Sequence, residues 1–109
     1  NNLGKFGEIL AVIYLFFKGY DIIGRNYRNF FGEVDIIAKK GRNLVFIEVK
    51  TRKKIGDVRQ LVNFSQQKRI KNSGSFFLAK SRKFKNCNIR FDLIVVGKKF
   101  WLRHFKDFM

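Results

Sequence analysis

Several residue types are scarce in this 109-residue chain, and each scarcity excludes a class of protein. There is no proline, and no low-complexity tract or repeat marks a linker, so we expect a single domain over residues 1–109. The one cysteine, Cys87, rules out an internal disulfide and a cysteine-built zinc site, and it favours a reducing cytoplasm. The one histidine, His104, rules out a cluster of histidine metal ligands. No Gly-rich run ends in Gly-Lys-Ser or Gly-Lys-Thr, so NTP-driven chemistry is not indicated.

Long hydrophobic runs are also missing. The longest covers residues 9–17, well short of the ~20 residues that a membrane-spanning helix needs. Glu8 precedes this run and Lys18-Gly19-Tyr20 follows it, where a signal peptide would have small residues at a cleavage site. We therefore expect neither secretion nor a membrane partner. Because the chain begins with asparagine, we also expect a few residues to precede Asn1.

Acidic residues are scarce relative to basic ones. There are 24 Lys and Arg against 8 Asp and Glu, which gives a formal charge of +16. Such a charge attracts polyanions, although an AT-rich genome would also enrich Lys, Asn, Ile and Phe. With 46% hydrophobic and 17% aromatic residues, the chain has the composition of a folded domain.

The hydrophobic pattern predicts a mixed α/β fold. Residues 3–18 are apolar nearly all round, which predicts a helix buried on most faces that ends at Gly19. Three short segments rich in Ile, Val and Phe predict strands at residues 20–27, 34–39 and 44–51, with a hairpin turn over 40–43.

The second half predicts a helix followed by one or two strands. Residues 57–80 are helical in pattern, with one face formed by Ile70, Gly74, Phe77 and Leu78. Its start is open, because Asp57 with Gln60 and Ser65 both offer N-caps. Residues 89–96 predict a strand that residues 98–105 can pair with across Gly97. The predicted order is αβββαβ with a fifth strand at the end.

The hairpin turn brings two carboxylates together. If the turn covers 40–43, Lys39 pairs with Leu44 and Asp35 lies opposite Glu48. Opposed residues have Cβ atoms about 4.5–5.5 Å apart, so two negative charges there require a cation between them. Glu48 and Lys50 point to the same face because side chains alternate along a strand. A register slip of one residue would separate Asp35 from Glu48.

Two carboxylates and an ammonium group suit phosphoryl chemistry. Mg²⁺ and Mn²⁺ prefer oxygen ligands and bind one or two carboxylates together with substrate phosphate, so Asp35 and Glu48 are candidate metal ligands. Lys50 could position the attacking water or neutralise the transition state. The simpler alternative is a solvated salt bridge, since Glu-x-Lys is common on strands. The clustering of Glu33, Asp35 and Glu48 in a basic chain favours a site, although Glu33 could simply belong to the turn.

Spaced motifs along the chain resemble those of a known family. They are Gly4-Lys5-Phe6-Gly7-Glu8, Arg25-Asn26-Tyr27-Arg28, Gly32-Glu33-Val34-Asp35 with Ile36-Ile37-Ala38, Val45-Phe46-Ile47-Glu48-Val49-Lys50-Thr51-Arg52, and Arg90-Phe91-Asp92. In this order they are similar to the YraN-like family of uncharacterised bacterial proteins, which resembles the PD-(D/E)XK nuclease superfamily and, more distantly, archaeal Holliday junction resolvases.

The resemblance implies a restriction-endonuclease-like core, with a mixed central sheet flanked by helices, and metal-dependent phosphodiester hydrolysis. It also implies that Asp35, Glu48 and Lys50 are the acidic and acid-x-Lys residues of the second and third strands, with Glu8 as the carboxylate of the first helix. From the residues alone, Glu8 could equally stabilise the start of its helix. Because resolvase-like enzymes act as dimers, the resemblance also makes a homodimer an expectation.

Basic residues near these positions are candidates for nucleic-acid binding. Lys68 and Arg69 would hold phosphate near the start of the second helix, with a solvated basic face as the alternative. A groove beside the hairpin would be lined by Arg25, Arg28, Arg52, Lys53 and Lys54, with Tyr27 and Phe30 as stacking surfaces. Asp92 is more typical of an ion-pair partner for an arginine than of a ligand.

Three functions fit these observations. The first is a Mg²⁺- or Mn²⁺-dependent endonuclease acting on nucleic acid, with DNA as the expected substrate and branched DNA within that class. The second is a module on the same fold that binds nucleic acid without cutting it. The third is a basic domain drawn by charge alone to RNA or an anionic membrane surface. Metal-dependent cleavage and preference for nucleic-acid shape distinguish the three.

Overall fold

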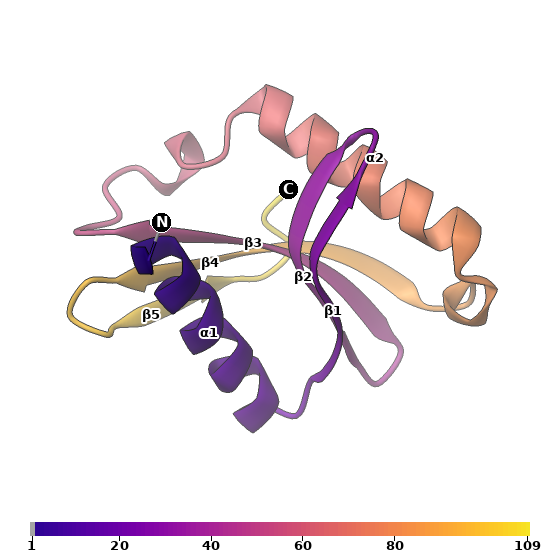
Figure 1. Cartoon of the computed structure of the whole chain (residues 1–109), viewed down its shortest axis with the longest axis horizontal. Helices are drawn as coiled ribbons and strands as arrows, with labels where there is room; N and C mark the ends of the chain where they lie inside the picture. The colour runs from indigo at the N-terminus through magenta and orange to yellow at the C-terminus, as the bar shows by residue number, and fades with distance from the viewer. Residues whose placement is uncertain (1) are drawn as a thin grey trace.

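The computed structural model describes residues 2–109, with side-chain surroundings from residue 4 onward. Its five strands form one sheet in the order β1-β2-β3-β4-β5, in which β3 and β4 are parallel and the other neighbours antiparallel. The mixed α/β class is confirmed, and the fifth strand is present (Figure 1). The elements are α1 (Asn2–Phe17), β1 (Asp21–Asn29), β2 (Gly32–Lys40), β3 (Asn43–Arg52), η1 (Val58–Gln60), α2 (Phe64–Lys80), η2 (Arg82–Phe84), β4 (Asn88–Gly97) and β5 (Leu102–Phe105).

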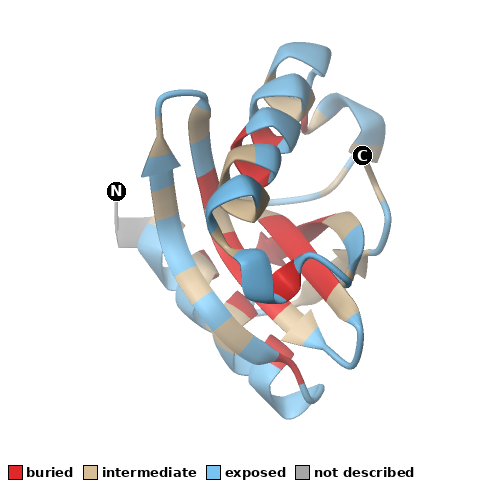
Figure 2. Cartoon of the chain, turned by 90° about the vertical axis from the view of Figure 1, so that its right-hand side faces the viewer, coloured by how far each residue is buried: buried red, intermediate tan, exposed pale blue. Residues whose placement is uncertain are grey.

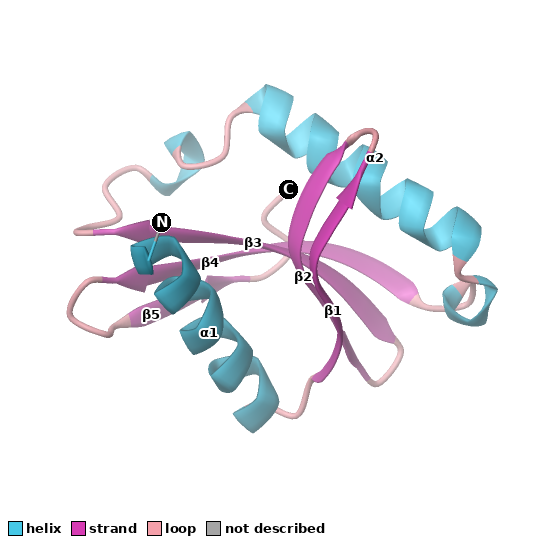
Figure 3. Cartoon of the chain, viewed as in Figure 1, coloured by secondary structure: helices cyan, strands magenta, loops and turns pink. Residues whose placement is uncertain are grey.

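The two helices cover opposite faces of the sheet (Figure 3). Alternation along β3 places Val45 and Ile47 in the core under α1, and Leu44 and Phe46 in the core under α2. Buried residues concentrate in the central strands, whereas the edge strand β1 is exposed or half-buried along its length (Figure 2). Both faces of β3 therefore pack into a hydrophobic core up to Ile47. Beyond it, Glu48 and Lys50 place charged side chains on the α2 side.

The first helix is less buried than its composition predicted. Ala11 and Leu15 are fully buried against the sheet, but Ile9 and Ile13 are each 47% exposed and Phe16 is 66% exposed. The expectation of a helix buried on most faces is wrong, because the sheet covers one side of α1 and none of the described segments covers the other. Neither helix described for residues 2–109 has the length and hydrophobicity needed to cross a membrane.

The second helix begins at a cap that the sequence analysis did not identify. Asn63 accepts a hydrogen bond from the Gln66 backbone N–H at 2.8 Å, and the Gln66 side chain accepts one from the Asn63 N–H at 3.2 Å. This reciprocal pair satisfies two backbone donors at once. The predicted starts at Asp57 and Ser65 are therefore wrong, and Asp57 caps η1 instead. The buried face of α2 includes Ile70 and Gly74, as predicted.

The hairpin of β1 and β2 turns away from β3 and leans towards α2 (Figure 1). Close contact at its tip fixes this position. Ser73 of α2 donates a hydrogen bond to Asn29 at 3.2 Å, and a Cβ at Gly32 would lie 3.3 Å from the Arg69 Cβ. On the other side of the sheet, Gly7 lets α1 approach β3 closely, because a side chain there would collide with the Thr51 hydroxyl. Both helices therefore converge where β2 and β3 separate.

Candidate active site

Asp35 lies where β2 and β3 separate. The two strands pair from Lys40–Asn43 to Ile36–Ile47, which is the register that the turn over 40–43 predicted. At the next position the Asp35 carboxylate accepts the Val49 N–H at 2.8 Å. Its side chain thus replaces a backbone acceptor and is held against β3 by a bond to the main chain.

Glu48 and Lys50 form a close ion pair on the α2 side of β3. The Lys50 Nζ lies 3.1 Å from a Glu48 carboxylate oxygen, and the two side chains are only 16% and 14% exposed. A solvated surface pair would be much more accessible than this. The simpler reading of Glu-x-Lys as a solvated face is therefore wrong for this strand.

The electrostatics of Asp35 reflect its burial next to a second carboxylate. Burial, followed by the negative charge of Glu48, raises the pKa of Asp35 to about 7, although the Val49 N–H favours the ionised form. A hydrogen bond to the Glu48 side chain and the charge of Glu33 raise the pKa further. Near neutral pH Asp35 is therefore partly protonated beside Glu48.

Glu8 of α1 faces the same region from the other side. It lines a cavity of about 440 Å³ together with Asp35, Glu33, Arg25 and Arg28. Burial and the charge of Asp35 raise the pKa of Glu8. Since α1 begins at Asn2, Glu8 lies beyond the first turn, where the helix dipole has little effect. The dipole explanation for Glu8 is therefore the weaker of the two that its sequence position allowed.

A second cavity of about 260 Å³ opens towards α2. Asp35 and Glu33 line it as well, and Glu48, Gln66 and Arg69 complete its polar lining. Asp35 thus lies between two cavities, one facing each helix. From the sequence, Glu33 was open between the site and the turn, and in the structure it lines both cavities with Asp35, whereas Gln66 was not predicted as a site residue.

Three of the six predicted nucleic-acid-binding residues line the cavities at the carboxylates. Arg25 and Arg28 line the cavity beside Glu8, and Arg69 lines the one beside Glu48. Arg69 also donates to the Ser65 hydroxyl at 2.8 Å, and Arg28 lies 3.3 Å from Glu33.

The other three predicted residues do not lie at the carboxylates. Arg52 is exposed and bonds the Thr51 carbonyl at 2.8 Å, whereas Lys53 lines a separate cavity near β5. Lys68 is exposed on α2 and lines none of the three cavities described here. Candidate phosphate contacts at the carboxylates are therefore Arg25, Arg28 and Arg69.

The residues present fit a divalent cation that shares its coordination with substrate. Among the described residues no group of three or more His, Cys, Asp or Glu is arranged to enclose a metal ion. Mg²⁺ usually keeps several waters and takes one or two carboxylates plus phosphate oxygens. Asp35 and Glu48 supply that number, and the raised pKa of Asp35 reflects its burial and then the nearby charge of Glu48.

Asp92 has a structural environment, as predicted. It is fully buried and accepts bonds from Arg90 at 2.9 Å, from the Asp107 N–H at 2.9 Å and from His104 at 2.6 Å. Burial opposes ionisation, but these partners outweigh it and lower the pKa of Asp92. The network ties β4 to β5 and, through a 2.9 Å hydrogen bond between the Tyr14 hydroxyl and His104 Nδ1, to α1.

The sequence is similar to those of one protein family over most of its length. The model of a family described as "Uncharacterised protein family UPF0102" matches residues 7–96. A UPF0102 protein of Ehrlichia ruminantium is 44% identical over 104 residues, covering 95% of this chain and 80% of its own length. One from Caldicellulosiruptor saccharolyticus is 44% identical over 96 residues, covering 86% and 80%. One from Thermodesulfovibrio yellowstonii is 42% identical over 99 residues, covering 89% and 87%.

Proposed function

The chain belongs to the UPF0102 family, which is the YraN-like family that its motifs resemble, and from that premise we propose that it is a metal-dependent endonuclease. The proposed reaction is hydrolysis of a phosphodiester bond, with DNA as the expected substrate and branched DNA within that class. One observation carries the proposal: Asp35 and Glu48 meet where two strands separate, with Lys50 bonded to Glu48. The resemblance to PD-(D/E)XK nucleases supports the same assignment.

Each residue has a chemical role in this proposal. Asp35 and Glu48 would hold Mg²⁺ or Mn²⁺, which when bound would acidify water and stabilise charge on the phosphate. Asp35 is fixed for this by the Val49 N–H, so its carboxylate needs little reorganisation. Lys50 would leave its ion pair with Glu48 to donate to the attacked phosphate or the attacking water. Glu8 would complete the acidic side of the site from α1.

Basic side chains around the carboxylates would hold the strand. Arg25 and Arg28 lie on the α1 side and Arg69 on the α2 side, so they bracket Asp35. Arginine binds phosphate oxygens through two parallel N–H bonds, which fixes orientation as well as charge. The strand is therefore expected to cross the site between the hairpin and α2.

A cleavage assay tests the proposal. The wild-type protein is incubated with linear duplex, single-stranded, flap and four-way-junction DNA, in Mg²⁺, in Mn²⁺ or in EDTA. We expect metal-dependent cutting that is lost in Glu48→Gln and Lys50→Ala. Asp21→Asn and Lys85→Ala are the matched controls, because both residues are exposed and lie outside the site. Equal cutting by Glu48→Gln would refute the assignment of the site.

The alternative is a non-catalytic module on the same fold. It would show no cutting on any substrate and tight binding that depends on nucleic-acid shape. A domain that binds by charge alone would show no preference for shape, and its binding would follow the salt concentration. In that case the paired carboxylates would have no role in binding.

The proposal extends to assembly and location. Resolvase-like enzymes act as dimers, and α1 carries a stripe of exposed apolar residues, formed by Phe6, Ile9, Ile13 and Phe16, that a second copy could cover. We therefore propose a homodimer through α1. The free thiol of Cys87 suits the reducing cytoplasm, where we expect the protein to act.

A further inference from the structure

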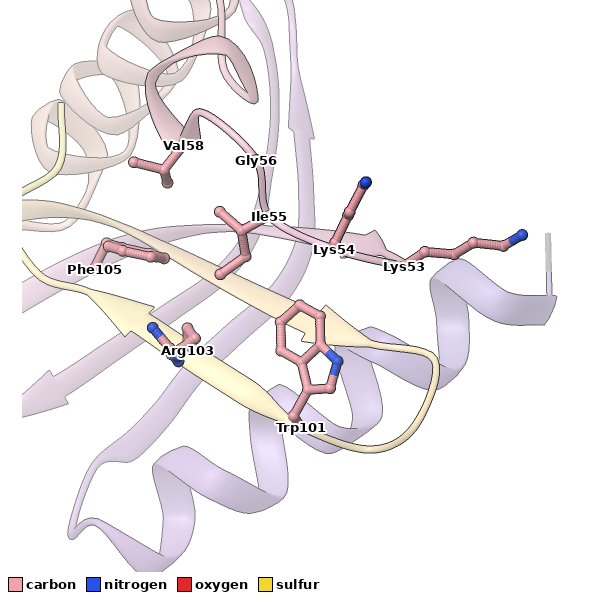
Figure 4. A pocket seen from close by; sticks show the side chains of 8 residues that line it. All are labelled: Lys53, Lys54, Ile55, Gly56, Val58, Trp101, Arg103 and Phe105. Atoms are coloured by element: carbon pink, nitrogen blue, oxygen red, sulfur yellow. The ribbon is translucent and has the colours of Figure 1, made fainter.

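A larger cavity lies beyond the carboxylates, between the loop after β3 and strand β5. It has a volume of about 570 Å³, within the range of pockets that hold small molecules. Figure 4 shows the loop on one side, with Trp101, Arg103 and Phe105 rising towards it from the other. We call this space the Trp101 cavity. Its β5 side lies outside residues 7–96, where the family model matches.

The Trp101 cavity opens on the same face of the sheet as Glu48 and Lys50. Across the sheet, Glu48 pairs with Leu93, which pairs with Phe105. Two residues further along β3, Lys50 pairs with Val95, which pairs with Arg103. Residues in register on neighbouring strands share a face, and neighbouring strands are about 4.8 Å apart. The cavity wall on β5 is therefore two strands, or about 10 Å, from the ion pair of the candidate active site.

The charges of the Trp101 cavity favour an anionic ligand. Lys53, Lys54 and Arg103 line it, and none of its eight described lining residues is acidic. Asp57, the nearest acidic residue along the loop, is paired with Arg59 at 3.2 Å. A ligand with one or more phosphates would meet three cations and no opposing carboxylate.

The remaining lining favours a flat apolar group. The Trp101 indole packs directly on the backbone of Gly97, where any side chain would overlap the ring, and the Gly97 N–H donates to the Trp101 carbonyl at 2.8 Å. The ring is thus held in place on a strand end. Nucleobases stack on such fixed aromatic rings, and cationic side chains next to the ring hold the backbone phosphate.

We propose that the Trp101 cavity binds one unpaired nucleotide of the strand whose phosphodiester lies at Asp35 and Glu48. The base stacks on Trp101 and its backbone phosphates lie at the mouth of the cavity, where Lys53 and Lys54 extend from the loop and Arg103 lies on β5 (Figure 4). This inference rests on the proposed function, since it assigns the cavity to the same strand. It also narrows the substrate class: a base inside a duplex is stacked on its neighbours, so the substrate has an unpaired nucleotide near the cleaved bond, as in a flap, a branch or a single strand.

The test uses the fact that Trp101 is the only tryptophan in the chain. Tryptophan emission is followed while the wild-type protein, in EDTA to prevent cleavage, is titrated with a thymidine oligonucleotide. The same titration is made with an abasic oligonucleotide of equal length and charge, and with polyglutamate. We expect the thymidine oligonucleotide to quench the emission and the other two to leave it nearly unchanged.

A variant supplies the second measurement. Trp101→Leu should weaken binding of the thymidine oligonucleotide by about 5- to 100-fold, the range for loss of one stacked base, and leave abasic binding unchanged. Lys54→Ala should weaken both to a similar degree. If Trp101→Leu does not fold, the wild-type quenching and the Lys54 variant still decide the question.

The outcomes separate this inference from the proposed nuclease activity. Equal quenching by the abasic oligonucleotide would overturn the base-binding role, and equal quenching by polyglutamate would identify an acidic-peptide site instead. Base-dependent quenching without metal-dependent cleavage would keep the nucleotide site and reject the nuclease. Metal-dependent cleavage without base-dependent quenching would keep the nuclease and reject the nucleotide site.

Discussion

Replacing Asp35 with asparagine should stabilise the metal-free protein at alkaline pH. The pKa of Asp35 is raised from 3.8 to about 7, so the folded protein holds this proton more tightly than the unfolded chain does. For a raised pKa, the contribution to stability is full below about pH 4 and is lost as the pH rises to about 7. Above that pH the folded state carries a buried charge next to Glu48, which asparagine removes.

The size of the effect follows from the shift. A shift of about 3 pH units corresponds to about 4 kcal/mol at 1.36 kcal/mol per unit, and this is an upper bound because the structure can relax around the charge. Asparagine keeps an oxygen that can accept the Val49 N–H, so little is lost in exchange. We expect Asp35→Asn to be more stable than wild type by about 2–4 kcal/mol at pH 8 and nearly equal to it at pH 4.

Urea unfolding from pH 4 to pH 8 in EDTA measures this difference, with Asp21→Asn as the control for loss of one exposed carboxylate. Adding Mg²⁺ or Mn²⁺ at pH 8 should stabilise wild type by about 2.7 kcal/mol at 100 times the dissociation constant, and should stabilise Asp35→Asn much less. A difference between wild type and Asp35→Asn that does not change with pH would refute the burial and charge repulsion described for Asp35 beside Glu48.

Four further changes have defined outcomes. Lys50→Ala should reduce cleavage by at least about 100-fold with little change in DNA affinity, as measured by single-turnover kinetics and by binding in EDTA. Asp92→Asn should lower the free energy of unfolding by about 3–5 kcal/mol, because it leaves the largely buried Arg90 guanidinium without its counter-charge, and urea unfolding measures this. Arg28→Ala should reduce the dependence of log affinity on log salt by about one, whereas a comparable reduction in Lys85→Ala would show that total charge alone matters. Ile13→Lys should convert a dimer to a monomer in sedimentation analysis, and a monomeric wild type would exclude the α1 dimer.

The register of the hairpin was predictable because two independent signals agree. The turn over residues 40–43 contains Gly41 with a positive φ of 60°, and the apolar positions of both strands then meet across the pair. Once the register is fixed, alternation places Glu48 and Lys50 on one face, and Asp35 remains next to them beyond the last β2–β3 pair because its carboxylate accepts the Val49 N–H. This is why the centre of the site could be inferred without coordinates.

Other features depend on packing that a single sequence does not encode locally. The apolar surface of α1 predicts burial, but which of its sides lies on the sheet is decided by Gly7 meeting Thr51, two residues far apart along the chain. The cap of α2 at Asn63 competed with other capping residues nearby. The Trp101 cavity needs the loop after β3 to lie over β5, and no periodic pattern predicts that arrangement.

The pKa values of two buried aspartates, Asp92 and Asp35, are shifted in opposite directions. Asp92 is surrounded by Arg90, His104 and a backbone N–H, and its pKa is lowered. Asp35 is placed beside another carboxylate, and its pKa is raised. In a chain with three basic residues for every acidic one, a cation for Asp35 would be easy to supply, yet four of the eight acidic residues line the two cavities that meet there. Four basic residues, Lys5, Arg25, Arg28 and Arg69, line the same cavities, yet the pKa of Asp35 stays raised, and a cationic ligand at Asp35 is what we propose to balance its charge.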